Sequence, residues 1–108
     1  MWSVNLQHYL DEKGSTDQVP VEARALAEHF GKIVSEVTLD YTGQLVAVPE
    51  ISCRNPDLHG CPGTILGYLA GQEFDQIHWV CNACEDSGSI SGWEDTLWDC
   101  VEIALKNL

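Results

Sequence analysis

Basic residues are scarce in this sequence. Five Lys and Arg stand against 17 Asp and Glu, which gives a formal net charge of −12 over 108 residues. Proteins that bind nucleic acid present clustered Lys and Arg to the phosphates. The basic residues here are scattered along the chain: Lys13, Arg24, Lys32, Arg54 and Lys106. We therefore expect no nucleic acid and no anionic membrane as partner, and a protein as the partner class.

Long apolar runs are also missing. No run approaches the roughly 20 residues needed to span a bilayer. The first eight residues, MWSVNLQH, have neither the basic start nor the apolar stretch of a signal peptide. The sequence therefore predicts a cytoplasmic protein. Four Trp residues and a hydrophobic content of 44% indicate a folded core, and a chain of 108 residues is expected to form one compact domain.

The first third of the chain has apolar residues at helical spacing. Residues 2–10 have Trp2, Leu6 and Tyr9 on one helical face, although Trp2 and Leu6 also belong to a strand-like alternation, and we prefer the helix. A second helix is predicted from Pro20, which suits a first helical position, to about residues 35–38. Gly31 interrupts its apolar stripe, so we expect a close packing contact there.

The period then changes to that of short strands. Four β-rich segments are predicted: Leu45–Val48, Thr64–Leu69, Gln76–Val80 and Ser89–Trp93. Five apolar residues of this region are expected to form a small core: Ile65, Ile77, Trp79, Ile90 and Trp93. The last stretch, Leu97–Leu105, has helical spacing and is predicted as a helix or a tail.

Cysteine is the residue type whose spacing points to chemistry. Five Cys in a cytoplasmic protein are expected to be reduced, and an odd number leaves one thiol unpaired in any disulfide scheme. Four of them form the pattern Cys53-x7-Cys61 and Cys81-x2-Cys84. Structural zinc is held tetrahedrally by four Cys or His ligands, so we expect these four cysteines to bind one structural Zn²⁺. The alternatives are His59 in place of Cys53, and four cysteines that cluster without a metal.

The other candidate residues are interpreted as structural. No Lys or Arg lies near Cys100 in the sequence to activate its thiol, so a packing role is expected. The carboxylates of Glu94, Asp95, Asp99 and Glu102 are expected to form a solvated acidic face rather than a catalytic pair. The chain has no phosphate-binding loop and no nucleophile elbow. No catalytic residue is therefore predicted.

The run from Cys53 to Asp99 resembles zinc-ribbon and rubredoxin-like modules. It is more narrowly similar to a group of small uncharacterised bacterial proteins, through Cys61-Pro62-Gly63-x-Ile65, Ile77-x-Trp79-x-Cys81-x-x-Cys84, Gly88-x-Ile90-x-x-Trp93 and Thr96-x-Trp98-Asp99. The resemblance implies a fold and a metal, and no activity. Typical knuckles of such modules read C-P-x-C-G, whereas this chain has Asn82 in place of the proline and Glu85 in place of the glycine.

These observations predict an α+β fold in which N-terminal helices pack on a small antiparallel zinc-ribbon-like β-sheet. Residues 1–49 are expected to form a helical region with a short strand, residues 50–96 the zinc-ribbon-like module, and residues 97–108 a C-terminal helix or tail. The predicted function is that of a non-enzymatic, small acidic zinc-binding protein, a protein-interaction or accessory module. The alternative is a rubredoxin-like iron protein for electron transfer. In rubredoxin sites, however, each of the two cysteine pairs is joined by a short loop (a corner), whereas the Cys53–Cys61 loop is long. Catalytic zinc needs an open coordination position, which four cysteines close.

Overall fold

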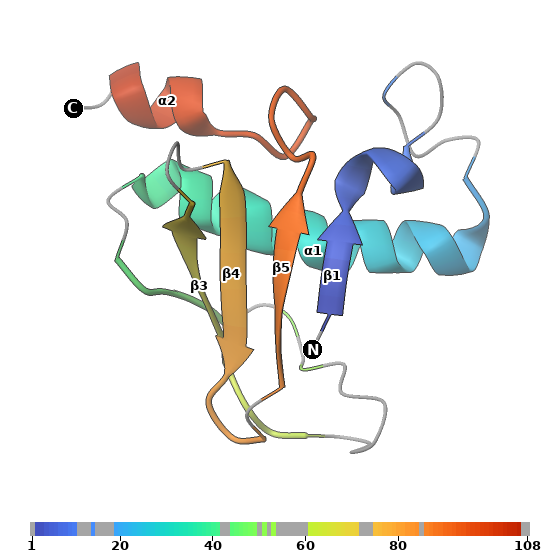
Figure 1. Ribbon diagram of the computed structural model, residues 1–108, viewed down its shortest axis with the longest axis vertical. Helices are drawn as coiled ribbons and strands as arrows, with labels where there is room; N and C mark the ends of the chain where they lie inside the picture. Colours follow the sequence, from blue (N-terminus) through green and yellow to red (C-terminus); the bar gives the residue numbers. More distant parts are fainter. Residues whose placement is uncertain are drawn as a thin grey trace.

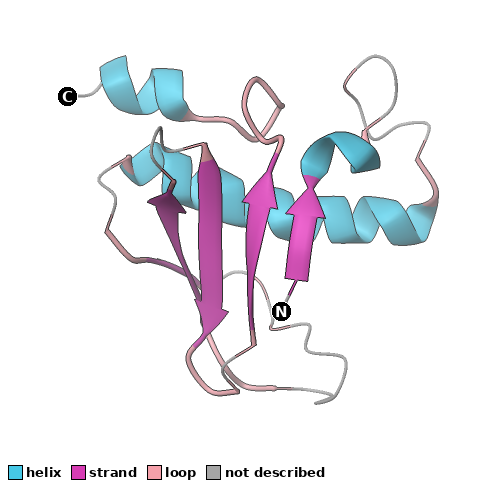
Figure 2. Ribbon diagram, viewed as in Figure 1, coloured by secondary structure: helices cyan, strands magenta, loops and turns pink. Residues whose placement is uncertain are grey.

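A five-stranded sheet with one long helix across its back organises the chain (Figures 1 and 2). The computed structural model describes residues 2–10, 14, 19–41, 44–49, 51, 53, 61–71, 75–84 and 86–106. The strands are β1 (Trp2–Asn5), β2 (Val46–Val48), β3 (Ile65–Ala70), β4 (Gln76–Cys81) and β5 (Ser87–Ser91). The helices are the 3₁₀ helix η1 (Leu6–Tyr9), α1 (Val21–Asp40) and α2 (Val101–Lys106). The strand order is β1-β5-β4-β3-β2.

The helix α1 supplies one wall of the core. Pro20 stands immediately before it, and Glu22 in its first turn complements the positive end of the helix dipole. The helix runs for 20 residues, so it extends slightly beyond the predicted end. It stops at Tyr41, which takes a left-handed conformation with φ 46° and whose N–H donates to the carbonyl of Val37 at 3.1 Å. Its buried apolar face consists of Ala27, Phe30, Ile33, Val34 and Val37.

Of the two helices predicted at the N-terminus, the second is present as α1 and the first is wrong. Residues Trp2–Asn5 form β1, which pairs in parallel with β5, and only Leu6–Tyr9 coil into a short 3₁₀ helix. The prediction of an antiparallel sheet is therefore also wrong: the sheet is mixed, because its other three pairings are antiparallel. The alternation that includes Val4 and Leu6 suits a strand as well as a helix. The edge of β5 gives this segment backbone hydrogen-bond partners, while Val4 and Leu6 enter the core.

The four strands predicted after residue 44 are confirmed, with ends shifted by one or two residues. The C-terminal helix is also present as α2. The five apolar residues expected in the core are all at most 3% exposed: Ile65, Ile77, Trp79, Ile90 and Trp93. Because β1 and β2 join the same sheet as β3, β4 and β5, residues before and after position 50 share one sheet. The division of the chain at residues 50 and 97 stays a prediction.

The close contact expected at Gly31 is confirmed. A Cβ at this position would overlap the indole of Trp98. Trp98 can therefore pack against α1 here because residue 31 has no side chain. Two hydroxyls of α1 hold the same segment: Ser35 donates to the carbonyl of Trp98 at 3.1 Å, and Thr38 accepts from the N–H of Cys100 at 3.0 Å. None of the helices in the described ranges is long and apolar enough to cross a membrane.

Candidate metal centre

The antiparallel pairing of β3 and β4 determines where the cysteines lie. Ile65 at the start of β3 is opposite Cys81 at the end of β4. Cys61, four residues before Ile65, therefore reaches the same end of the sheet, the arrowhead end of β4 in Figure 1. Cys84 follows β4 in a turn. Cys53 comes from the segment between β2 and β3 and completes the group.

The structure brings the four predicted ligands together. Their sulfur atoms all lie within 4.8 Å of one another. Two of the pairs each join one of the first two cysteines to one of the last two: Cys53 Sγ is 3.6 Å from Cys84 Sγ, and Cys61 Sγ is 3.7 Å from Cys81 Sγ. Tetrahedral Zn–S bonds near 2.3 Å place sulfurs about 3.8 Å apart. These two pairs match that spacing, while the set as a whole is looser than the roughly 4 Å expected for every pair. The cluster can hold a metal ion.

The cluster lies at the rim of the core. Cys53 and Cys81 are 7% and 1% exposed, and Cys61 and Cys84 are half-buried. All four residues pack against the core of the sheet and α1. Four sulfur donors form a soft ligand set, which suits zinc, copper(I) or iron and not magnesium or calcium.

The thiol of Cys61 titrates in an environment made by its neighbours. A backbone hydrogen bond from Gly63 lowers the pKa of this thiol. Partial burial and the adjacent sulfurs of Cys84 and Cys81 act in the opposite direction, and their combined effect raises the pKa of Cys61 above its ordinary value. A metal that binds here must therefore displace a proton from this thiol.

Asn82 joins the segment that follows Cys61 to the segment that follows Cys81, through two hydrogen bonds to Thr64. Its backbone N–H donates to the carbonyl of Thr64 at 3.1 Å, and its side-chain Oδ1 accepts from the N–H of Thr64 at 2.9 Å. The N–H of Cys81 donates to the carbonyl of Asp86 at 2.7 Å, which closes the turn on its other side. Sequence reasoning noted Asn82 only as a substitute for proline. The available signal was that Asn side chains capture backbone N–H groups in turns.

The remaining candidates do not join this cluster. His59, the alternative ligand, lies outside the described residues. Cys100 is half-buried beside α1, and the described metal-ligand cluster does not include it. His78 lies on β4, where its ring nitrogens are 3.3 Å from Tyr68 Oη and 3.3 Å from Gln76 Oε1.

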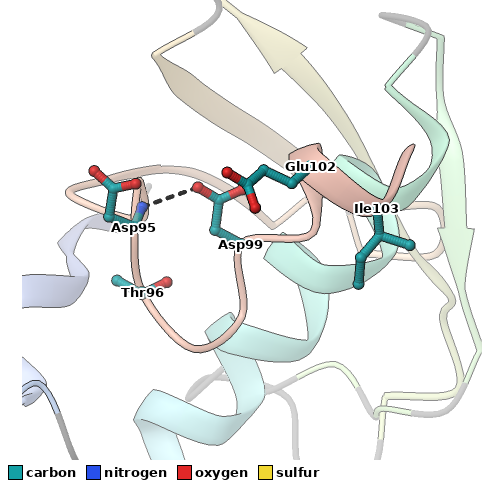
Figure 3. A pocket seen from close by; sticks show the side chains of 5 residues that line it. All are labelled: Asp95, Thr96, Asp99, Glu102 and Ile103. Atoms are coloured by element: carbon teal, nitrogen blue, oxygen red, sulfur yellow. Dashed lines mark hydrogen bonds between the residues drawn. The ribbon is translucent and has the colours of Figure 1, made fainter. Parts of the chain in front are cut away.

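The acidic loop before α2 and the start of α2 line a hollow of about 340 Å³. Figure 3 shows its lining: Asp95, Thr96, Asp99, Glu102 and Ile103. The carboxylate of Asp99 accepts from the N–H of Asp95 at 2.9 Å and from the N–H of Val101 at 3.0 Å, so it is engaged in holding the loop and the start of α2. Asp95 and Glu102 are exposed, as expected for a solvated acidic face.

Comparisons with known proteins find no relative of this chain. The chain matches no protein-family model, and neither the curated proteins nor the solved structures contain a match. The cysteine cluster supports a possible metal site, and the resemblance to zinc-ribbon modules stays a prediction. What the structure establishes is an α+β chain with four cysteine sulfurs gathered at one end of a mixed sheet.

Proposed function

We propose that this chain is a non-enzymatic zinc protein in which Cys53, Cys61, Cys81 and Cys84 hold one structural Zn²⁺. The observation that carries the proposal is the gathering of their four sulfurs within 4.8 Å. Four thiolates complete a tetrahedral shell and leave no position for water or substrate. Such a centre suits a structural role better than a catalytic one.

The metal would act as a crosslink between segments that are far apart in the sequence. Cys53 belongs to the segment before β3, Cys61 leads into β3, and Cys81 and Cys84 flank the turn after β4. Structural zinc contributes on the order of 10–16 kcal/mol of apparent binding free energy in zinc-finger peptides, and most of it is available to folding. A chain of this size has only one modest core, so a contribution of that size would dominate its stability.

The acidic surface supports a protein as the partner. With 17 Asp and Glu against five Lys and Arg, the chain attracts basic protein surfaces, does not repel neutral ones, and repels phosphate backbones and anionic lipids. Apolar side chains around α2 add contact area, since Leu97, Ile103 and Leu105 are 62%, 52% and 50% exposed. The proposed role is therefore that of an interaction or accessory module. The chemistry of the surface indicates a class of partner and no single protein.

Metal analysis of the purified, reduced protein tests the proposal. One equivalent of zinc per chain is expected, and removal by a strong chelator should unfold residues 50–96, which hydrogen exchange would report. Absence of zinc together with unchanged exchange in chelator would remove the proposal. Iron in place of zinc, with the strong visible absorption of Fe³⁺–thiolate bonds, would instead support the electron-transfer alternative, because the same four thiolates suit both metals.

Substitutions identify the ligands. Cys81→Ser and Cys84→Ser are each expected to abolish stoichiometric zinc binding, because each removes one of four thiolates. Cys100→Ser is the matched control and should retain one zinc per chain. At the first corner, Cys53→Ser should lose zinc and His59→Ala should keep it. The reverse result would assign the ligand to His59.

A further inference from the structure

We infer that Asn82 is a positioning residue of the metal centre: its side chain fastens the two cysteine corners together and so determines how tightly the metal is held. This inference rests on the proposed metal site. It concerns a residue that donates no ligand atom, and it explains why this chain has asparagine where a knuckle of the zinc-ribbon type has proline.

The geometry shows what the side chain replaces. Ile65 and Cys81 are the last pair in the β3–β4 register, so Thr64 and Asn82 would be the next pair. One of their two ladder bonds is regular, since the N–H of Asn82 donates to the carbonyl of Thr64 at 3.1 Å. The return bond from the N–H of Thr64 goes to Asn82 Oδ1 at 2.9 Å, and not to a main-chain carbonyl.

Because Asn82 Oδ1 replaces a main-chain carbonyl as the acceptor, the chain can turn at Asn82 and still pair with Thr64. The main chain after Asn82 is free to turn towards Cys84, while the pairing with Thr64 is kept. Thr64 is three residues after Cys61, and Asn82 directly follows Cys81. The two bonds therefore hold Cys61 and Cys81 at the same end of the ladder, where their sulfurs are 3.7 Å apart. A metal then binds to thiols that are already gathered.

Substitutions at position 82 distinguish the contribution of the side-chain acceptor from that of the backbone N–H. Alanine keeps the N–H of residue 82 and loses the acceptor, whereas aspartate keeps an acceptor oxygen at the same distance from the main chain. Thr64 takes part only through its backbone, so Thr64→Ala leaves both hydrogen bonds in place. Residues that hold metal-bearing segments in place commonly change metal affinity by 10–100-fold, and one uncharged hydrogen bond accounts for roughly tenfold or less.

The test uses Co²⁺ as the probe, with competition against a chromophoric chelator, on the full chain and its Asn82→Ala, Asn82→Asp and Thr64→Ala variants. We expect Asn82→Ala to bind Co²⁺ roughly tenfold more weakly. Its visible bands should remain those of a tetrahedral four-thiolate site, because all four ligands are intact. Asn82→Asp should recover most of the affinity, and Thr64→Ala should match the unaltered chain.

The outcomes separate this inference from the proposal beneath it. If the unaltered chain shows no thiolate-to-cobalt absorption, the metal site itself is refuted. If it binds Co²⁺ and Asn82→Ala binds equally well, the positioning role is overturned while the site stands. If Asn82→Ala does not fold, Asn82→Gln, whose amide is displaced by one methylene, takes its place. The role then requires weaker Co²⁺ binding by Asn82→Gln than by Asn82→Asp, and equal binding overturns it.

Discussion

Gly63 lies directly against the sulfur of Cys81. An added Cβ at this position would overlap that sulfur and lie 2.9 Å from the Cβ of Ala83. Gly63→Ala should therefore push Cys81 away from the other three sulfurs. Overpacking of this kind costs about 1–3 kcal/mol, so Co²⁺ affinity is expected to fall by about 5- to 150-fold. A spectroscopic Co²⁺ titration measures the change.

Gly67→Ala is the control for this effect. Its added Cβ would meet the side chains of Val37 and Ile33 at 2.8 and 3.2 Å, inside the core between β3 and α1. This variant should lower the free energy of unfolding and leave the arrangement of sulfurs intact. Gly63→Ala binding Co²⁺ as tightly as the unaltered chain would show that the corner can move aside without cost.

The four cysteines of the candidate site could be identified from the sequence, whereas the residues that position them could not. Four cysteines in two clusters predict a shared site whatever the details of the fold, because metal-ligand spacing is local at each corner. The contact of Gly63 with Cys81 and the bonds between Asn82 and Thr64 depend on the register of β3 against β4. Register arises from packing over the whole sheet, so a pattern of single residues does not reveal it.

The C-terminal segment is attached to α1 through Thr38. This side chain is fully buried; its hydroxyl donates to the carbonyl of Val34 at 2.7 Å and accepts from the N–H of Cys100 at 3.0 Å. Thr38→Val keeps the shape and leaves the N–H of Cys100 without this acceptor. The expected loss is about 1–3 kcal/mol in the free energy of unfolding, measured by urea denaturation at fixed metal content.

Ser35→Ala provides the comparison on the same helix. The Ser35 hydroxyl donates to the carbonyl of Trp98 at 3.1 Å from a half-buried position. Water can replace this donor, so the loss should be at most about 1 kcal/mol. If Thr38→Val costs no more than Ser35→Ala, the bond to Cys100 does not hold the segment in place.

Among the elements, the N-terminal segment shows where local patterns are insufficient. Trp2 and Leu6 satisfy both a helical and a strand-like spacing over so few residues. Pairing with the edge of β5 favours the strand over the helix, because Gly88–Ser91 provide backbone partners for Trp2–Asn5. By contrast, α1 is 20 residues long, has apolar residues at helical spacing and is preceded by a proline, so its existence and type were predictable.

At the scale of the whole molecule, the cysteine cluster and the acidic hollow lie at opposite ends of the sheet. The cysteine sulfurs lie where β4 ends. The acidic hollow follows the end of β5, which runs antiparallel to β4. The hollow is therefore at the opposite end of the sheet from the sulfurs. The antiparallel pairing of β4 with β5 is sufficient for this arrangement. The edge strand β1 makes the sheet mixed, and nothing local in the sequence links residues 2–5 to residues 88–91. Fold class was predictable from element types, whereas topology was not.

The overall charge leads to a prediction about partners. Zinc ribbons often bind nucleic acid, but this chain has a formal net charge of −12 and five Lys and Arg in total. Of these, Lys32 is engaged with Glu36 at 3.1 Å, and Arg24 donates to the carbonyl of Val19 at 3.3 Å. Release of counterions by clustered cations drives non-specific binding, and these cations are too few and too scattered to supply it. Anisotropy titrations with single- and double-stranded DNA and RNA at near-physiological salt should show no binding at micromolar protein. Micromolar binding that weakens steeply as salt rises would contradict the proposed protein-interaction role, because it would require a basic surface that outweighs the acidic one.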